Sequence, residues 1–481
     1  MVKAGRSLEI MALPVILVAA GINFFLELGA PSYFVDEALS IEHSLPGLTQ
    51  LTAVVRTTET TPYTYFLGLH EWLYHGGSQV ETAARLPSAI AGVLLVAATY
   101  WMARAFLNRR FALVAAMLTA LSPLVLEYAQ QVRVYVFVML ATVISVGATV
   151  RGARGNPRWL VLGAVAAVLA VLLHYTATFV IVALCAWLVL QSSVPKRARA
   201  GVVGAVLVAE AVLAPLFVAQ YRAAPNGGDL ADADLSGTGV VRIAQTPFDG
   251  RWVGGVDALR VVGVAVVVVA VVSVWMCGRG SIRDARLLVG LGVAAPVALI
   301  LAGMLGKDIL ITRYTAVSAP LLVTAVAAAI AVAPRPAAAV LAATALAAAT
   351  GGLIKSHGES GYYGPARQTI DYIASDVEPG DAMVVPGSPA ADISLGFYAE
   401  RRLSPRPTFV ASTDANGSAA AFENGGRIWI VRQSEEAAPS QSELLALSRP
   451  GLATVGYRPV KARAFETSTT LLAVLAEPAG P

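Results

Sequence analysis

Long apolar runs dominate this sequence and leave few folds open to it. A run of about 17 to 25 apolar residues has the length that an α-helix needs to cross a bilayer. Eleven such runs follow one another, at residues 9–29, 84–105, 110–126, 133–150, 159–174, 177–192, 200–220, 258–276, 287–305, 314–333 and 336–354. The first is longer than a signal-peptide core and lacks a convincing small-residue cleavage site, so we interpret it as an uncleaved span. The runs predict a polytopic α-helical membrane protein with about eleven transmembrane helices.

Composition supports this prediction. Hydrophobic residues make up 56% of the 481 residues and charged residues only 14%, whereas about a quarter of a soluble domain is charged. The formal net charge of +4 comes from the membrane part. We interpret the excess of Lys and Arg over Asp and Glu in this part as a determinant of the orientation of the spans in the membrane. No nucleic-acid partner is expected.

Basic residues indicate the orientation of the chain. If the N-terminus is cytoplasmic, every inner loop carries Lys or Arg, from Lys3 and Arg6 to Arg335, as the positive-inside rule requires. The same alternation places the loops at 30–82 and 221–257, and everything after residue 354, outside the cytoplasm. We expect a multi-pass protein of the cytoplasmic membrane, with an odd number of spans.

Two regions outside the apolar runs have structure of their own. The first outer loop has amphipathic stretches at His43–Arg56 and Thr64–Tyr74, which predict short helices in the membrane interface. The second, at 221–257, is rich in Gly and Asp, and we expect it to be mobile, as a lid over a site would be. After residue 354, predicted helices at 367–375, 392–400 and 440–447 alternate with predicted strands at 382–385, 408–411, 427–432, 453–457 and 470–476. We therefore predict a transmembrane catalytic domain at 1–354 and an extracytoplasmic α/β domain at 355–481.

The adjacent carboxylates of Asp36 and Glu37 follow the first apolar run. Ionisable groups at the mouth of a helix bundle are functional candidates, because leaving them unpaired in apolar surroundings costs several kcal/mol. The alternative is an N-cap and a first-turn acid, which would stabilise the helix that follows.

Other polar side chains are predicted on the same outer side. Arg133 begins the fourth span and Arg313 the tenth, although either arginine could simply reach to the interface. His174 lies between the fifth and sixth spans, where an interfacial histidine with purely structural partners is the alternative. The remaining candidates are Glu59, Tyr63, Tyr135 and Tyr314. Two arginines, a histidine and several acids suit an anionic lipid head group together with a hydroxyl to be activated.

These motifs, in this order, resemble a known family. The acidic pair, Glu59 with Pro62 and Tyr63, the Arg-Leu-Pro-Ser stretch at 85–88, Gln-Val-Arg-Val-Tyr at 131–135, His-Tyr at 174–175 and Arg-Tyr at 313–314 resemble the polyprenyl-phosphate-dependent GT-C glycosyltransferases. Within them the chain is similar to the family 39 type, which includes bacterial protein O-mannosyltransferases, and to the aminoarabinose transferase of lipid A. The resemblance covers about residues 8 to 335. Gln131 departs from it, since relatives often carry an acid there.

The resemblance implies an inverting sugar transfer on the outer face of the membrane. The donor would be a sugar on polyprenyl phosphate, with mannose and arabinose as the candidate sugars, and the acceptor a hydroxyl of a cell-envelope glycan, lipid or protein. Asp36 would be the base, with Glu37 orienting the base or the acceptor. Arg133 and Arg313 would bind the phosphate, and His174, Glu59, Tyr63, Tyr135 and Tyr314 would line the site.

Two questions stay open on sequence grounds. No strong metal-ligand spacing is present and no cofactor is assigned, but some relatives use a metal, so a divalent ion remains an alternative. A transporter or flippase of a lipid-linked sugar would also place charges in a helix bundle. Against it, the sequence shows no internal repeat, and its acids gather at one surface rather than at the midplane. A non-catalytic assembly or sensing protein is a third alternative.

Overall fold

The structure is a computed structural model. It describes residues 2–223, 247–248, 258–277, 285–304, 312–358, 364–386, 389–411, 421–422, 425–434, 438–466 and 470–479. Most of the predicted outer loop at 221–257, including the candidate lid, therefore lies outside the described residues.

The chain divides into two compact units. The first contains residues 1–26, 43–78 and 84–356, and the second contains residues 27–42, 79–83 and 357–481. Two short segments of the predicted first outer loop thus belong to the same unit as the C-terminal residues.

The first unit is a bundle of apolar helices, consistent with the predicted polytopic class. Seven described helices are long and apolar enough to cross a membrane, and an eighth span results if the helix pair at 109–129, bent by 58°, is counted as one. Three shorter apolar helices accompany them. The bounds are α1 (Val2–Phe25), α5 (Glu81–Ala103), α6 (Arg109–Ala120), α7 (Pro123–Ala129), α8 (Tyr135–Arg154), α9 (Trp159–Leu173), α10 (Ala177–Val189), α11 (Lys196–Ala223), α13 (Ala258–Cys277), α14 (Ala285–Met304), η1 (Thr312–Ser318), α15 (Ala319–Val332) and α16 (Arg335–Gly358).

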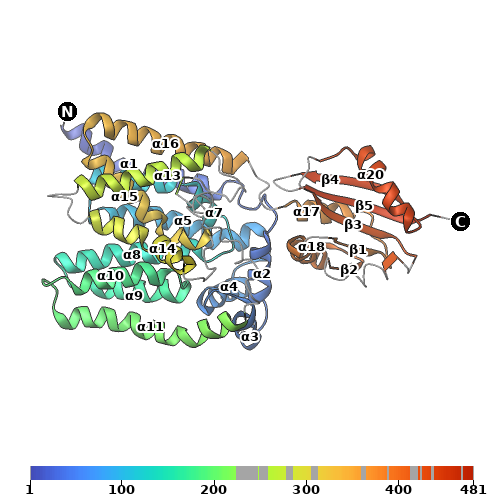
Figure 1. The fold of residues 1–481 in the computed structure, drawn as a ribbon, viewed down its shortest axis with the longest axis horizontal. Coiled ribbons are helices and arrows are strands. Elements are labelled where there is room, and N and C mark those ends of the chain that lie inside the picture. Colours follow the sequence, from blue (N-terminus) through green and yellow to red (C-terminus); the bar gives the residue numbers. More distant parts are fainter. Residues whose placement is uncertain are drawn as a thin grey trace. The chain divides into compact units, whose positions relative to one another are not determined.

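Helix α15 is the centre of one part of this bundle. All of its residues from Ala319 to Ile330 are buried, and it packs against α6, α13 and α14. Figure 1 shows a neighbouring group in which α8, α9, α10 and α11 run side by side. Alanine fills many of the buried positions of α15, and its small side chain allows close approach of neighbouring helices.

The predicted first outer loop folds as three helices where two were predicted. They are α2 (Val35–Ser44), α3 (Leu48–Thr58) and α4 (Tyr63–His75). The prediction of one helix across 43–56 was wrong, because the chain breaks at Pro46 and Gly47 before α3 begins. Proline disfavours helical backbone in the residue before it and cannot donate a backbone hydrogen bond, which ends α2 there.

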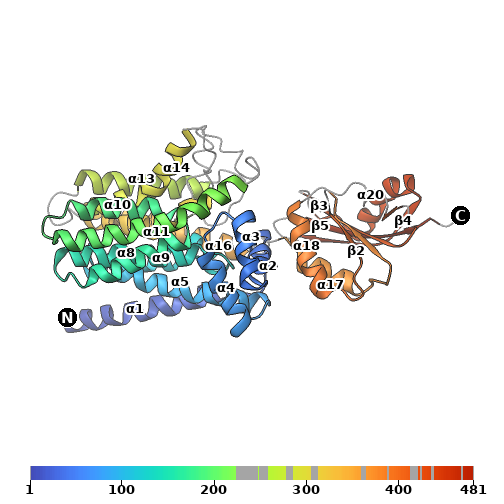
Figure 2. The ribbon, with the colours of Figure 1, turned by 90° about the horizontal axis from the view of Figure 1, so that it is seen from below.

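The C-terminal part of the second unit is a five-stranded sheet with helices. Its strands are β1 (Ala382–Val384), β2 (Thr408–Val410), β3 (Ile428–Ser434), β4 (Tyr457–Glu466) and β5 (Thr470–Pro478), in the order β2-β1-β3-β5-β4. β1 pairs in parallel with β2 and β3, placing Ala382 opposite Thr408 and Ile428, while β5 pairs antiparallel with β3 and β4. The helices are α17 (Ala366–Ala374), α18 (Pro389–Arg402) and α20 (Gln441–Thr454). Figure 2 shows these elements in a view turned by 90° from that of Figure 1.

Both faces of the sheet are covered. Leu444 and Leu452 of α20 join the core formed around Ile428, whereas Tyr372 of α17 contacts the ring of Trp429. Adjacent residues of a strand point to opposite faces, so α20 and α17 pack on opposite sides of β3.

One strand prediction in this part was wrong. Residues 453–457 were expected to form a strand, but α20 continues to Thr454 and β4 begins only at Tyr457. Gly456, with φ of 77°, makes the turn between them. A glycine in this left-handed conformation is a common way to end a helix.

Candidate active site

Asp36 and Glu37 lie in the first turn of α2, within the second unit. Glu37 is completely buried, and its carboxylate accepts a hydrogen bond from the backbone N–H of Phe34 at 3.1 Å. A glutamate that reaches back in this way is one half of a capping box. Glu37 therefore stabilises the start of the helix that carries Asp36. Asp36 is half-buried, and its backbone carbonyl accepts a hydrogen bond from the Ser40 hydroxyl at 2.7 Å.

Arg133 lies in a short turn between two helices of the first unit. Ser122 caps α7 by accepting a hydrogen bond from Val125, and Pro123 occupies the first turn. α7 then ends at Ala129, and α8 begins at Tyr135. Proline at this position is preorganised for a helix start, so the local sequence accounts for where α7 begins, and Arg133 lies in the turn that follows its end. Its guanidinium group lies 5.9 Å from the ring centre of Tyr135.

His174 occupies the turn between α9 and α10. It is the C-cap of α9 in extended conformation, and only 2% of its surface is exposed. The Thr176 backbone N–H donates to His174 Nδ1 at 3.2 Å, and the Thr176 hydroxyl lies 2.9 Å from the same nitrogen. Since Nδ1 accepts the backbone bond, the proton of the neutral ring is on Nε2. Nε2 is buried and has no hydrogen-bond partner among the described residues.

The structure brings His174 together with four other predicted residues. Its ring centre lies 5.5 Å from that of Tyr135 and 5.3 Å from that of Tyr314. Burial lowers the pKa of His174 to about 3, and the positive charges of Arg133 and Arg313 contribute to this shift. Both arginines therefore act electrostatically on one imidazole, which stays neutral at physiological pH.

Arg313 and Tyr314 come to this cluster from the helix η1, which precedes α15. The Tyr314 hydroxyl lies 3.3 Å from the Thr60 hydroxyl. Thr60 belongs to the turn between α3 and α4, which also contains Glu59. The Glu59 carboxylate pairs with His43 Nδ1 at 2.8 Å, so its immediate partner is a histidine that the sequence reading did not single out.

Tyr63 lies beside a second buried network. Burial, and in smaller part Tyr63, raises the pKa of Tyr175, whose hydroxyl donates to Gln220 Oε1 at 2.7 Å. The Gln220 amide donates to the carbonyls of Val55 and Thr61 at 2.9 and 3.0 Å. Gln220 thus ties the turn carrying Glu59 to α11. Sequence reasoning missed it, and a lone amide near the end of an apolar run was the only signal available.

Two acids of the helix bundle also have partners. Glu210 accepts a hydrogen bond from Thr178 at 2.6 Å, which supplies the partner that the sequence could not name. Glu127, only 5% exposed, accepts a hydrogen bond from the Gln131 amide at 3.3 Å. It was not among the predicted residues, although an acid within the apolar α7 was a usable signal.

No group of three or more His, Cys, Asp or Glu side chains in the described parts of the chain could hold a metal ion. The basic side chains around His174 suit an anion better than a cation.

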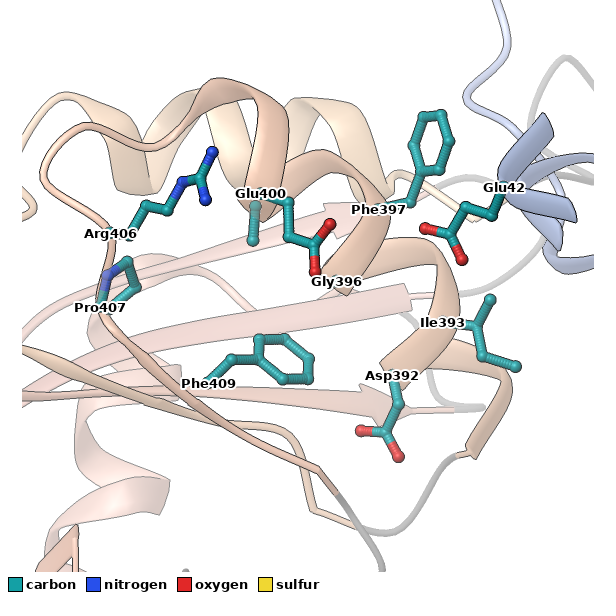
Figure 3. A pocket seen from close by; sticks show the side chains of 10 residues that line it. Glu42, Asp392, Ile393, Gly396, Phe397, Glu400, Arg406, Pro407 and Phe409 are labelled. Carbon is teal, nitrogen blue, oxygen red and sulfur yellow. The ribbon is translucent and has the colours of Figure 1, made fainter. Parts of the chain in front are cut away.

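The second unit contains a separate cavity of about 250 Å³. It lies between α2, α18 and β2 and is lined by Glu42, Asp392, Ile393, Gly396, Phe397, Ala399, Glu400, Arg406, Pro407 and Phe409. Figure 3 shows the carboxylate of Glu400 pointing from α18 toward the ring of Phe409. None of the predicted site residues lines this cavity.

Comparison with known proteins identifies the fold. The model of the family described as dolichyl-phosphate-mannose-protein mannosyltransferase matches residues 65–218, which include Arg133, Tyr135 and His174. No curated protein matches the sequence.

Solved structures similar to this one include the following three. ArnT from Cupriavidus metallidurans, bound to undecaprenyl phosphate, matches with a TM-score of 0.57 and 13% identity over 97% of both chains. The arabinofuranosyltransferase AftD from Mycobacteria matches with a TM-score of 0.50 and 17% identity, over 98% of this chain and 40% of its own. An oligosaccharyltransferase from Archaeoglobus fulgidus, tethered to an acceptor peptide, matches with a TM-score of 0.50 and 11% identity, over 91% of this chain and 69% of its own.

These likenesses extend over nearly the whole chain, and the family match falls within the helix bundle. The protein therefore has the fold of these membrane transferases, and its helix bundle contains the stretch that matches the mannosyltransferase family model.

Proposed function

We propose that this protein is an inverting glycosyltransferase that moves a sugar from a polyprenyl-phosphate donor to an acceptor hydroxyl. The observation that carries the proposal is the cluster in which Arg133 and Arg313 both act on the buried, neutral His174. The cluster offers two fixed positive charges and a buried N–H donor, which suit a phosphate group. The similar ArnT structure holds undecaprenyl phosphate, a lipid of the kind proposed here as the carrier of the sugar.

The proposed reaction is a single displacement. The acceptor oxygen attacks the anomeric carbon as the bond from that carbon to the phosphate oxygen breaks, which inverts the anomeric centre. The acceptor proton passes to the Asp36 carboxylate, and polyprenyl phosphate leaves with its added negative charge balanced by Arg133 and Arg313. Tyr135 and Tyr314 flank His174, and Glu59 and Tyr63 belong to the adjoining turn. We propose that these residues line the donor site.

The cellular arrangement is part of the proposal. The N-terminus would be cytoplasmic, and the catalytic loops and residues 355–481 would lie outside, where a lipid-linked donor is needed because nucleotide sugars are absent. Mannose and arabinose are the proposed sugars, with a cell-envelope glycan, a lipid or a protein as acceptor. Cysteines introduced singly at Ser193 and Ser375 would test the topology, since only the second should react with an impermeant thiol reagent in intact cells.

Purified protein in vesicles, supplied with radiolabelled polyprenyl-phosphate mannose or arabinose, tests the activity. Envelope extract from a deletion strain provides the acceptor. Transfer by the wild type, with inversion at the anomeric carbon in the product, is the expected result. Movement of the labelled lipid between leaflets without any transfer would instead support a flippase.

A further inference from the structure

The segment that carries Asp36 is attached to the helices of the C-terminal part of its own unit. Arg367, in α17, is the centre of this attachment. Its guanidinium group donates to the carbonyl of Gly29 at 3.0 Å and to that of Ala30 at 2.6 Å. It also pairs with the Glu81 carboxylate at 2.9 Å. One side chain thus joins both short segments of the first outer loop, 27–42 and 79–83, to α17.

Tyr398 of α18 makes a second attachment. Its hydroxyl donates to Glu81 Oε1 at 2.7 Å and accepts from the backbone N–H of Tyr33 at 2.7 Å. The Tyr33 ring stacks on that of Tyr398 at 6.1 Å and meets Phe397 edge-on at 5.3 Å. Tyr33, Glu81 and Tyr398 are each at most 3% exposed. These bonds are therefore shielded from water, which strengthens them and makes their loss costly.

Further bonds extend the attachment to the start of α2. The Ser32 hydroxyl accepts from the Arg367 backbone N–H at 3.1 Å and donates to Gln368 at 2.9 Å. The backbone N–H of Phe34 is bound by Glu37. The chain is thus fixed at several residues between Gly29 and Glu37, and Asp36 lies near the end of this segment, in the first turn of α2.

We propose that Glu81, Arg367 and Tyr398 are positioning residues that hold the Asp36 segment in its catalytic geometry. This inference rests on the proposed function, because it takes Asp36 as the base. A base must be held within a fraction of an ångström of its productive position, and a loop between helices cannot supply that precision alone. The C-terminal α/β domain supplies it through α17 and α18. We assign none of the three residues a direct part in the chemical step.

Tyr398→Phe is the sharpest test, because it removes one oxygen and keeps the ring that packs on Tyr33. Tyr457→Phe is the matched control. Its hydroxyl donates to the Phe422 carbonyl at 3.1 Å in the same unit, but it has no contact with the first outer loop among the described residues. Hydrogen–deuterium exchange over residues 29–37 and steady-state transfer kinetics are measured on the full-length protein in vesicles.

For Tyr398→Phe we expect exchange at 29–37 to be at least tenfold faster and kcat to fall at least tenfold, with the KM for the lipid donor unchanged. Tyr457→Phe should change neither. Arg367→Ala should resemble Tyr398→Phe. Arg367→Lys keeps a positive charge beside the Glu81 carboxylate and should recover part of the lost activity. Arg367→Ala removes the charged partner of the buried Glu81 carboxylate, so the thermal stability of this variant is measured in parallel.

Two results would overturn the inference. Unchanged exchange at 29–37 in Tyr398→Phe would show that the attachment does not hold the segment. Faster exchange with full transfer activity would show that the reaction does not depend on it. If the wild-type protein transfers no sugar, the proposed function fails, and exchange still decides whether α17 and α18 hold the segment.

Discussion

The ring of His174 lies 5.3 Å from that of Tyr314, centre to centre, and the two come from segments 140 positions apart in the sequence. This contact brings the turn after α9 to the start of η1, which carries Arg313. The contact between the rings of His174 and Tyr135 brings Arg133 to the same imidazole. The ends of three helical segments thus form one basic cluster. Variants of these residues, and of the acid proposed to work with them, test the proposed chemistry.

Asp36→Asn should abolish sugar transfer. The amide keeps the size of the side chain but cannot take up the acceptor proton, and losing a general base typically costs about 10² to 10⁴ in rate. Transfer of radiolabelled sugar in vesicles measures the effect. Asp392→Asn, an acid of the separate cavity in the same unit, is the control and should remain active. Full transfer by Asp36→Asn would remove Asp36 from the mechanism.

Glu37 should affect stability more than chemistry. Glu37→Ala removes the hydrogen bond to Phe34, and losing a cap costs about 0.5 to 2 kcal/mol of stability. Glu37→Gln should cost less, because the amide oxygen still accepts that bond. Thermal unfolding in detergent, measured together with transfer, separates the two roles. If Glu37→Gln is as stable as the wild type yet inactive, the carboxylate acts in the reaction itself.

Arg133→Lys and Arg313→Lys should each raise the KM for the lipid donor about tenfold or more. Lysine keeps the charge but loses the planar donor fork that fits a phosphate. Arg222→Lys is the matched control, since Arg222 is an exposed arginine in the last turn of α11. Donor titrations measure KM directly. An unchanged KM in both variants would argue against phosphate binding by this pair.

The low pKa of His174 predicts an acid-sensitive fold. Its folded pKa of about 3 lies below the unfolded value of 6.5, so between these values the unfolded chain binds a proton that the folded chain does not. Stability therefore falls as the pH drops through this window, by at most about 1.4 kcal/mol per pH unit from this one group. Above pH 6.5 the group makes no pH-dependent contribution.

His174→Gln should lose this dependence, because glutamine does not titrate. Unfolding is measured in detergent between pH 7 and pH 4. The free energy of unfolding should change less with pH in the variant than in the wild type, and the difference in slope should correspond to at most one bound proton. His75→Gln, which changes an exposed histidine paired with Glu71 at 3.3 Å, is the control. Equal slopes for the wild type and His174→Gln would show that His174 titrates normally in the folded protein.

Replacing Gln220 should lower the stability of the fold, because this one side chain makes three hydrogen bonds. Gln220→Ala removes bonds to Val55, Thr61 and Tyr175 and leaves buried polar groups unsatisfied, at about 1 to 3 kcal/mol. Gln191→Ala, which removes a single bond to the Trp187 carbonyl, should cost about 0.5 kcal/mol or less. Equal thermal shifts for the two variants would contradict a tie between α11 and the turn at Glu59.

The sequence by itself determined the class of fold. Apolar length decides what crosses a bilayer, and each of the eleven predicted runs coincides with an apolar helical element of the described chain. Local chemistry also indicated most of the α/β elements after residue 354. It failed where two local signals competed, at the Pro46–Gly47 break and at the end of α20.

Only the tertiary structure decided how the polar residues are grouped. Arg133, His174 and Arg313 are separated by long apolar runs, and no local pattern says which helix ends meet. Gln220 and Glu127 gave no periodic signal in the sequence. The partners of Gln220 lie far away along the chain, and the partner of Glu127 is Gln131, four residues later. The segments at 27–42 and 79–83 join the C-terminal unit through the side chains of Arg367 and Tyr398. A sequence cannot show this, because such contacts between distant residues form only when the whole chain packs.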